Sequence, residues 1–234
     1  MPVGLEFSGV ISAVVPETAG FTGPLNAGDE VIAAGVRGGY AEQLVADAAN
    51  VGHKPANLSF EQAAGLLAAG ATAWHLLTAT KVGAGETVLL RDYGAVPVEY
   101  GAGLVDRVRA IGPVDVALDL VGTDEALDTS VELVADRGRI ATIAGFARAA
   151  ELGILALSGA DGGAEIRAAA WPQLVKLAAD RKLRGHRRQG VLARGGAGGA
   201  PVSADRAGPR KSRTGPRRNQ MPAGRAQRTW GLTL

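Results

Sequence analysis

The sequence predicts an α/β protein, in which a small antiparallel β portion is followed by a parallel sheet with helices between its strands. Two patterns predict this class. In the first fifty residues, short β-branched runs alternate with glycine and acidic turns, which is typical of antiparallel strands. Beyond residue 59, apolar strands alternate with amphipathic helices, as in a doubly wound sheet. We therefore divide the chain into residues 1–58, 59–184 and a basic segment at 185–234.

Three apolar segments are expected to form the antiparallel strands, at residues 10–15, 30–34 and 40–45. The last of them begins with Tyr40, in a Gly-Gly-Tyr-Ala-Glu motif. The Tyr40 hydroxyl could serve a substrate pocket, but an aromatic residue in such a strand more often packs inside a barrel. We favour the packed position.

A helix is expected to begin after Ser59, because Ser59 and Gln62 have the spacing of a capping box. Apolar and small residues then recur along one helical face: Leu67, Ala71, Trp74 and Thr78. Gly83 and Gly85 end this helix and lead into an apolar strand at residues 88–90.

The next elements read as repeated strand and helix. Residues 114–122 form an apolar run with interspersed aspartates, which is typical of a parallel strand whose carboxyl end faces a ligand. Thr123 can cap a helix that Gly138 closes, and residues 139–145 supply the following strand. A last amphipathic helix carries Trp171, Leu174, Val175 and Ala178, with Pro172 in its first turn.

A glycine-rich phosphate loop is missing from the sequence after the strand at 88–90. Such a loop places backbone N–H groups and a helix N-terminus against a pyrophosphate, and side chains would block that approach. Here Leu90 is followed by Arg-Asp-Tyr-Gly-Ala-Val-Pro, and Gly94, Gly101 and Gly103 fit no fingerprint spacing.

Five motifs stand in one order with short spacings: Gly4-Leu-Glu-Phe-Ser-Gly-Val10, Gly28-Asp-Glu-Val-Ile32, Gly38-Gly-Tyr-Ala-Glu42, Pro55-Ala-Asn-Leu-Ser59 and Ala71-Thr-Ala-Trp74. From about residue 1 to 183 the chain resembles the medium-chain dehydrogenase/reductase superfamily, in its zinc-independent NADPH:quinone oxidoreductase-like branch. The resemblance implies a partial GroES-like β-barrel at 1–58 and an incomplete Rossmann-type doubly wound sheet at 59–184. Relatives carry further strands before the first motif.

The resemblance also implies a function and a site. Family members transfer a hydride from NADPH to a quinone, an enone or another activated double bond, and many are homodimers. The positions that match the nicotinamide side of the cofactor are Thr72, Gly122, Ile143 and Gly145. Small residues at carboxyl strand ends let a flat ring approach the backbone, although ordinary packing explains these residues equally well. No catalytic residue can be named.

In the family, a segment like residues 90–95 lies well after the phosphate loop, its helix and the second strand. We therefore favour an internal gap that removes the ~30 residues of one βαβ unit. The alternative is a shorter loop that the local glycines rebuild. With the gap, NADPH affinity is expected to be weak, and an inactive remnant of such an enzyme is the alternative function.

Composition excludes several other classes. The chain contains no cysteine, which excludes disulfides, a catalytic thiol and thiolate zinc sites. Its three histidines lack metal-ligand spacing, so no metal is expected. No apolar stretch reaches the ~18 residues of a membrane span, and no leader pattern precedes the first motif, so a cytoplasmic location is expected.

The segment at 185–234 differs in charge from the rest. Residues 1–184 carry 14 basic and 22 acidic side chains, a charge of −8, whereas residues 185–234 carry 11 and 1, a charge of +10. This segment is rich in Arg, Gly and Pro, and we expect it to be disordered. It could be a nucleic-acid-binding arm, a solvated extension or a frameshift product.

We favour the frameshift, because permitted codons for residues 200–206, read two bases earlier, give alanine-histidine-arginine-phenylalanine-leucine, as near the C-terminus of the family. Residues 190–194 shift in the same direction.

Overall fold

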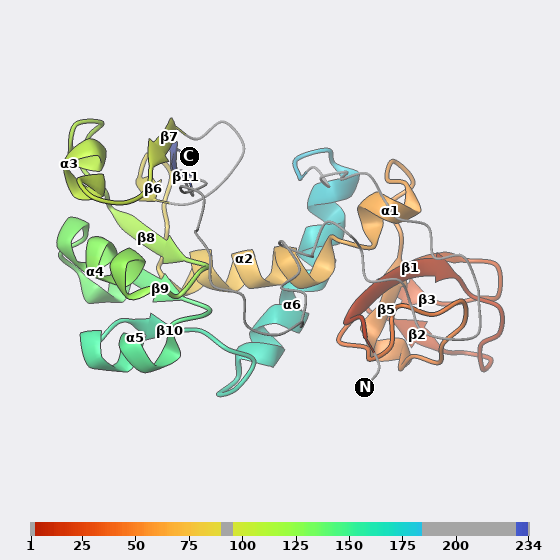
Figure 1. Cartoon of the computed structure of the whole chain (residues 1–234). Coiled ribbons are helices and arrows are strands. Elements are labelled where there is room, and N and C mark those ends of the chain that lie inside the picture. The colour runs from red at the N-terminus through yellow and green to blue at the C-terminus, as the bar shows by residue number, and fades with distance from the viewer. Residues whose placement is uncertain (1–2, 90–95, 184–227, 234) are drawn as a thin grey trace, which may run out of the picture. The chain divides into compact units, whose positions relative to one another are not determined.

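The computed structural model describes residues 3–89, 96–183 and 228–233, and it divides into two compact units. The first unit contains residues 3–72 and 165–183, and the second contains residues 73–89, 96–164 and 228–233. Figure 1 shows the elements of each unit. The predicted α/β class is confirmed, because antiparallel strands come first and a largely parallel sheet follows. Residues 90–95, where the sequence lacks a glycine-rich phosphate loop and an internal gap is expected, lie outside the described residues, as do residues 184–227.

The first unit is built on a three-stranded antiparallel sheet, in the order β1 (Glu6–Val10), β4 (Glu30–Ala34), β5 (Val51–His53). A second, two-stranded ladder joins β2 (Ala19–Gly20) to β3 (Gly23–Pro24), and a 3-10 turn, η1 (Ala48–Asn50), precedes β5. Five buried residues, in these strands or close to their ends, form its core: Leu25, Val31, Ala33, Val36 and Val51.

Two of the predicted antiparallel strands need correction. The strand expected at 10–15 forms earlier, as β1, and residues 40–45 form no strand. The N–H groups of Gly38 and Gly39 both donate to the carbonyl of Gly4, at 3.0 and 3.2 Å, which no regular ladder allows. Tyr40 is 48% exposed, so its predicted packing inside a barrel is wrong.

The helix expected after Ser59 is interrupted. Its capping box is present, since Ser59 Oγ accepts the Gln62 N–H and Gln62 Oε1 accepts the Ser59 N–H. However, α1 (Phe60–Ala63) stops before Gly65, and α2 (Leu67–Ala79) starts anew. The N–H of Ala68 donates to Glu6 Oε2 at 2.8 Å. The Glu6 carboxylate of β1 thus accepts a hydrogen bond from a backbone N–H in the first turn of α2. This contact joins residues far apart in sequence, so no local sequence pattern predicts it.

The second unit contains a six-stranded sheet in the order β10 (Leu155–Ala156), β9 (Ile140–Thr142), β8 (Val116–Asp119), β6 (Thr87–Leu89), β11 (Arg228–Thr233), β7 (Val96–Glu99). The strands from β10 to β6 are parallel. Three predicted strands, at 88–90, 114–122 and 139–145, therefore correspond to β6, β8 and β9.

Residues 228–233 correct the expectation of a wholly disordered tail. They form β11, which pairs antiparallel with β6 on one side and β7 on the other (Figure 1). The expectation of disorder rested on the mean composition of all fifty residues at 185–234. That mean does not reflect the short Arg-Thr-Trp-Gly-Leu-Thr segment, which contains residues with β propensity. It pairs over both of its edges, which local composition cannot indicate.

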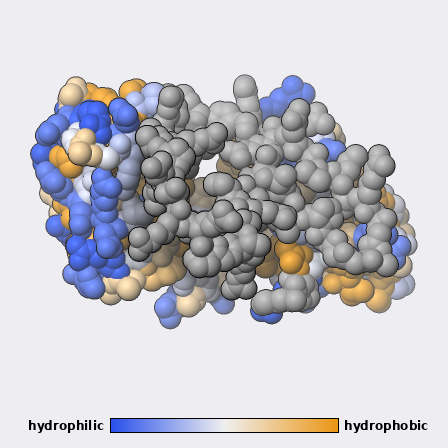
Figure 2. Space-filling model, in the orientation of Figure 1, coloured by the Kyte–Doolittle hydropathy of each residue, from blue (hydrophilic) through white to orange (hydrophobic). Residues whose placement is uncertain are grey.

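Side chains on the two faces of this sheet enter different cores. On one face, Leu89, Ala117 and Ile140 pack with residues of α3 (Leu104–Arg109), α4 (Asp124–Leu133) and α5 (Phe146–Leu152). On the other, Val88, Val116 and Ala141 pack with Leu76 of α2. Figure 2 shows hydrophilic residues over the outer side of α3 to α5. The strands are thus buried on both faces, as parallel strands require.

For the helices of the second half, the predicted N-terminal cap is confirmed, but the predicted start and end residues differ from those observed. Thr123 caps α4 as predicted, with its hydroxyl accepting the Ala126 N–H, but α4 ends at Leu133 and Gly138 lies in a separate 3-10 turn, η2 (Arg137–Arg139). The last helix, α6 (Gly163–Ala179), starts earlier than predicted, so Pro172 lies in its interior. Alanine-rich residues before Trp171 favour helix strongly enough to extend past the proline. None of the described helices is long and apolar enough to cross a membrane.

A partly exposed ion pair between Glu86 and Arg139 gives this unit a pH dependence. Glu86 Oε2 accepts the Gly83 N–H at 2.7 Å and Arg139 Nη2 at 2.5 Å, and these bonds lower the pKa of Glu86 below its ordinary value of 4.5. A lowered folded pKa means that the stabilisation is complete above 4.5 and is lost as pH falls through the folded pKa.

We expect Glu86→Gln to unfold at a lower temperature than the parent chain at pH 7, and the two midpoints to converge in acid. Thermal unfolding followed between pH 7 and 3 measures this difference. A gap between the two midpoints that stays constant across that range contradicts the assignment.

Candidate functional site at the carboxyl edge of the sheet

The carboxyl ends of β8 and β9 lie side by side, because these strands are parallel and pair in register from Ala117 with Ile140 to Asp119 with Thr142. Each strand is followed by a short loop, at residues 120–122 and 143–145. The Ile143 N–H donates to the Asp119 carbonyl at 3.2 Å, which continues the pairing to the edge. In open α/β sheets ligands bind at this edge.

Asp119 ends β8 with a buried carboxylate. Its Oδ1 accepts the N–H groups of Val121 and Gly122 at 3.1 and 3.0 Å, and its Oδ2 also accepts the Gly122 N–H at 3.0 Å. A buried carboxylate is stable only with such partners, and here most come from the loop that follows the strand.

Thr142 ends β9 and joins the two loops. Its hydroxyl donates to Asp119 Oδ2 at 2.5 Å and accepts the N–H groups of Ala144 and Gly145 at 3.1 and 3.0 Å. The Thr142 side chain is fully buried. We call Asp119 and Thr142, with these bonds, the loop clamp.

Three of the four residues predicted for the cofactor side come together here. Gly122 has a φ of +78°, and a Cβ on it would lie 2.7 Å from the Gly145 nitrogen and 2.8 Å from the Ala144 carbonyl carbon. Gly145 caps α5, and its own Cβ would lie 3.2 Å from Gly122 Cα. Ile143, between them, packs partly buried against the α2 side of the sheet. The two loops therefore touch through backbone, which requires glycine at 122.

The fourth predicted residue, Thr72, lies on α2 in the first unit. Its hydroxyl donates to the Ala68 carbonyl at 2.9 Å, four residues earlier in the helix. This is a common local bond of a helical threonine and does not by itself indicate a ligand. Its role at the cofactor stays a prediction.

Apolar side chains at this edge are exposed rather than buried. Leu120 is 43% exposed, Val121 55% and Phe146 44%, and all three adjoin the clamped loops. Sequence reasoning missed them, as it missed Asp119 and Thr142. One signal was present: an aspartate within an apolar strand must find partners when it is buried.

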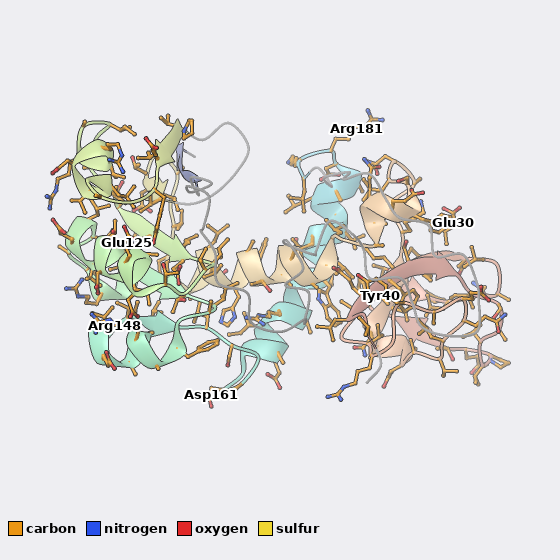
Figure 3. The ribbon with its side chains drawn as sticks, in the orientation of Figure 1. Glu30, Tyr40, Glu125, Arg148, Asp161 and Arg181 are labelled. Carbon is orange, nitrogen blue, oxygen red and sulfur yellow. The ribbon has the colours of Figure 1, made fainter. Side chains whose placement is uncertain are left out.

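The start of α4 carries charge of the wrong sign for a phosphate. Asp124 and Glu125 occupy its first turn, and Figure 3 labels Glu125 there. Thr123 Oγ1 also shares a hydrogen bond of 2.9 Å with the Tyr100 hydroxyl. Partial burial raises the pKa of Tyr100, and the Glu125 carboxylate adds to the rise, so this hydroxyl stays neutral at pH 7.

No group of three or more metal-binding side chains occurs among the residues that the structure describes. The site thus offers backbone groups, two buried polar side chains and exposed apolar ones. Such an edge can hold a flat, largely apolar ring, whereas the residues described there give no side chain to which acid–base or covalent catalysis can be assigned.

Comparison with known proteins agrees with this architecture. No protein-family model matches the chain. An alcohol dehydrogenase of Geobacillus stearothermophilus is 40% identical to it over 101 residues, which are 43% of this chain and 28% of that protein. The chain thus matches less than a third of the length of this curated relative.

Solved structures match over a longer stretch. A mycobacterial protein solved in complex with NADPH is 20% identical, with 77% of this chain and 72% of that one covered and a TM-score of 0.56. A quinone oxidoreductase of Pseudomonas syringae is 22% identical, with 77% and 71% covered and a TM-score of 0.54. The JamJ enoyl reductase is 18% identical, with 78% and 69% covered and a TM-score of 0.60.

At these identities the likeness establishes the fold. It agrees with the two-part order of elements described above, antiparallel strands followed by a doubly wound sheet. The fold class that the motifs implied is thereby confirmed: the chain has a GroES-like β portion followed by a Rossmann-type sheet, as these solved oxidoreductase structures do.

Proposed function

We propose that the chain is an NADPH-dependent oxidoreductase of the quinone oxidoreductase or enoyl reductase type, which keeps the nicotinamide side of its site and binds the cofactor weakly. The observation that carries this proposal is the pair of clamped loops after β8 and β9. Gly122, Ile143 and Gly145 lie there together, at the sheet edge where dinucleotide folds bind their ligand.

The chemistry needs little from the protein's side chains. A bound NADPH supplies a hydride, which a quinone or an activated carbon–carbon double bond accepts together with a proton from water. The protein contributes orientation and exclusion of water. An edge with backbone groups and exposed apolar side chains, such as Leu120 and Phe146, suits that task, and the acceptor is a small molecule.

Weak binding follows from the sequence after Leu90. A glycine-rich loop normally gives backbone N–H donors to the diphosphate, and no such fingerprint occurs between Leu90 and Gly103. The acidic first turn of α4 offers no substitute. Losing these charge-assisted bonds costs about 4 kcal/mol, which takes a micromolar Kd toward millimolar.

A titration followed by nicotinamide fluorescence tests both parts of the proposal. We expect the parent chain to bind NADPH with a Kd near millimolar, and Gly145→Val to weaken that binding further, because its side chain meets Leu127 and the Gly122 backbone. Tight saturable binding by the parent chain contradicts the lost diphosphate anchor. Equal affinity of the parent and the variant contradicts the nicotinamide assignment.

A further inference from the structure

The loop clamp has a directional pattern of hydrogen bonds. The Asp119 carboxylate can only accept, and its protein donors are the N–H groups of the first loop and the Thr142 hydroxyl. The Thr142 hydroxyl has one proton, which it gives to Asp119, so its lone pairs are free for the N–H groups of Ala144 and Gly145. Each loop is therefore held by its N–H groups.

This direction fixes where the carbonyl groups of the loops point. All peptide bonds in the described chain are trans, and in a trans peptide group the N–H and the C=O point in opposite directions. The N–H groups of residues 121, 122, 144 and 145 point into the clamp. The carbonyl oxygens of residues 120, 121, 143 and 144 consequently point away from it.

We propose that Asp119 and Thr142 are positioning residues, which turn four backbone carbonyl oxygens outward to form a rim of hydrogen-bond acceptors at the site. This inference rests on the proposed function, since the matching ligand is a flat ring that carries N–H donors, such as the carboxamide group of nicotinamide. Leu120, Val121 and Phe146 place exposed apolar surface beside the rim. The rim therefore selects a donor group on an apolar ring, and it disfavours anions.

Three variants separate the clamp from general stability. Thr142→Val keeps the shape of the side chain but removes three hydrogen bonds, and Thr142→Ser keeps the hydroxyl. Thr80→Val is the matched control: Thr80 is also fully buried in the same unit, and its hydroxyl only donates to the Leu76 carbonyl at 2.7 Å.

Two measurements are made on each full-length chain. The first is the rate of amide hydrogen exchange at residues 121, 122, 144 and 145, followed by NMR in the absence of cofactor. The second is the affinity for NADPH, from a titration up to millimolar concentrations. We expect Thr142→Val to speed exchange at the Ala144 and Gly145 amides and to weaken NADPH binding about tenfold or more. Thr142→Ser and Thr80→Val should leave both close to the parent.

The outcomes are distinguishable. Unchanged exchange in Thr142→Val shows that the clamp does not hold the loops, which overturns the inference. Faster exchange with unchanged NADPH affinity overturns the positioning role while leaving the clamp as a structural feature. A parent chain that does not bind NADPH at all overturns the proposed function, and the positioning role with it, whatever the exchange data show.

Discussion

Replacing Gly122 by alanine should destabilise the second unit by about 3 kcal/mol or more, and lower its unfolding midpoint by roughly 12–24 °C. Two costs combine. Gly122 has a φ of +78°, which is unfavourable for any residue with a Cβ. The added Cβ would also lie 2.7–2.8 Å from backbone atoms of Ala144 and Gly145, which cannot rotate away as a side chain can.

Gly153→Ala is the control for the first cost alone. Gly153 follows α5 with a φ of +66°, and, apart from its own atoms and its two chain neighbours, no atom of the described residues lies within 4 Å of the place that a Cβ would take. Only the backbone conformation is therefore penalised, by about 1–2 kcal/mol. Thermal unfolding of both variants, beside NADPH titration, measures the difference. If Gly122→Ala is no less stable than Gly153→Ala, the two loops do not approach as closely as described, and the clamp loses its physical basis.

The sequence predicted those parts of the site that follow from topology. An apolar run such as 114–122 is a parallel strand buried on both faces, and parallel strands place their ends at one edge. Small residues at these strand ends were expected to let a flat ring approach the backbone; the structure adds that Gly122 and Gly145 also bring the two loops into backbone contact with each other. Thr123 was predictable as a cap for a local reason, since its partner lies only three residues away in the sequence.

The rest depends on partners distant in sequence. Asp119 and Thr142 meet across 23 residues, and nothing in either strand shows that an aspartate in one will accept from a threonine in the other. The break between α1 and α2 likewise involves Glu6, 62 residues away from Ala68. The prediction for Tyr40 failed in the same way, because its segment is held by carbonyls near the N-terminus. A local sequence pattern indicates only the secondary structure that a segment prefers, and contacts between residues distant in sequence can override that preference.

Only some of the exposed ion pairs can be anticipated from the sequence. Arg148, labelled in Figure 3, donates to Asp128 of α4 and to Glu151 of its own helix, both at 2.7 Å. The Glu151 pair has a helical spacing that the sequence displays, whereas the Asp128 pair needs α4 and α5 to be adjacent. Both are exposed and contribute little to stability.

The position of β11 bears on the internal gap proposed after Leu90. Because β11 is antiparallel to both β6 and β7, those two strands run in the same direction with one strand between them. Parallel strands normally need a connection of about a dozen residues or more, usually with a helix. Only residues 90–95 separate β6 from β7. The internal gap expected from the sequence would explain both features, because the strand of a lost βαβ unit would lie between β6 and β7.

A chain shortened to end at residue 227 should therefore be less stable than the full 234-residue chain, by about 3–5 kcal/mol, with a broader unfolding transition. Without β11, the facing edges of β6 and β7 lose the partners of seven register positions. Gly231 pairs with both Leu89 and Val96, so Gly231→Pro, which removes a backbone donor in the middle of a sheet, should reproduce most of that loss. Calorimetry of the three chains measures it. Equal unfolding midpoints for all three would show that the C-terminal strand does not support the sheet, and would favour a tail produced by a frameshift, without a structural role.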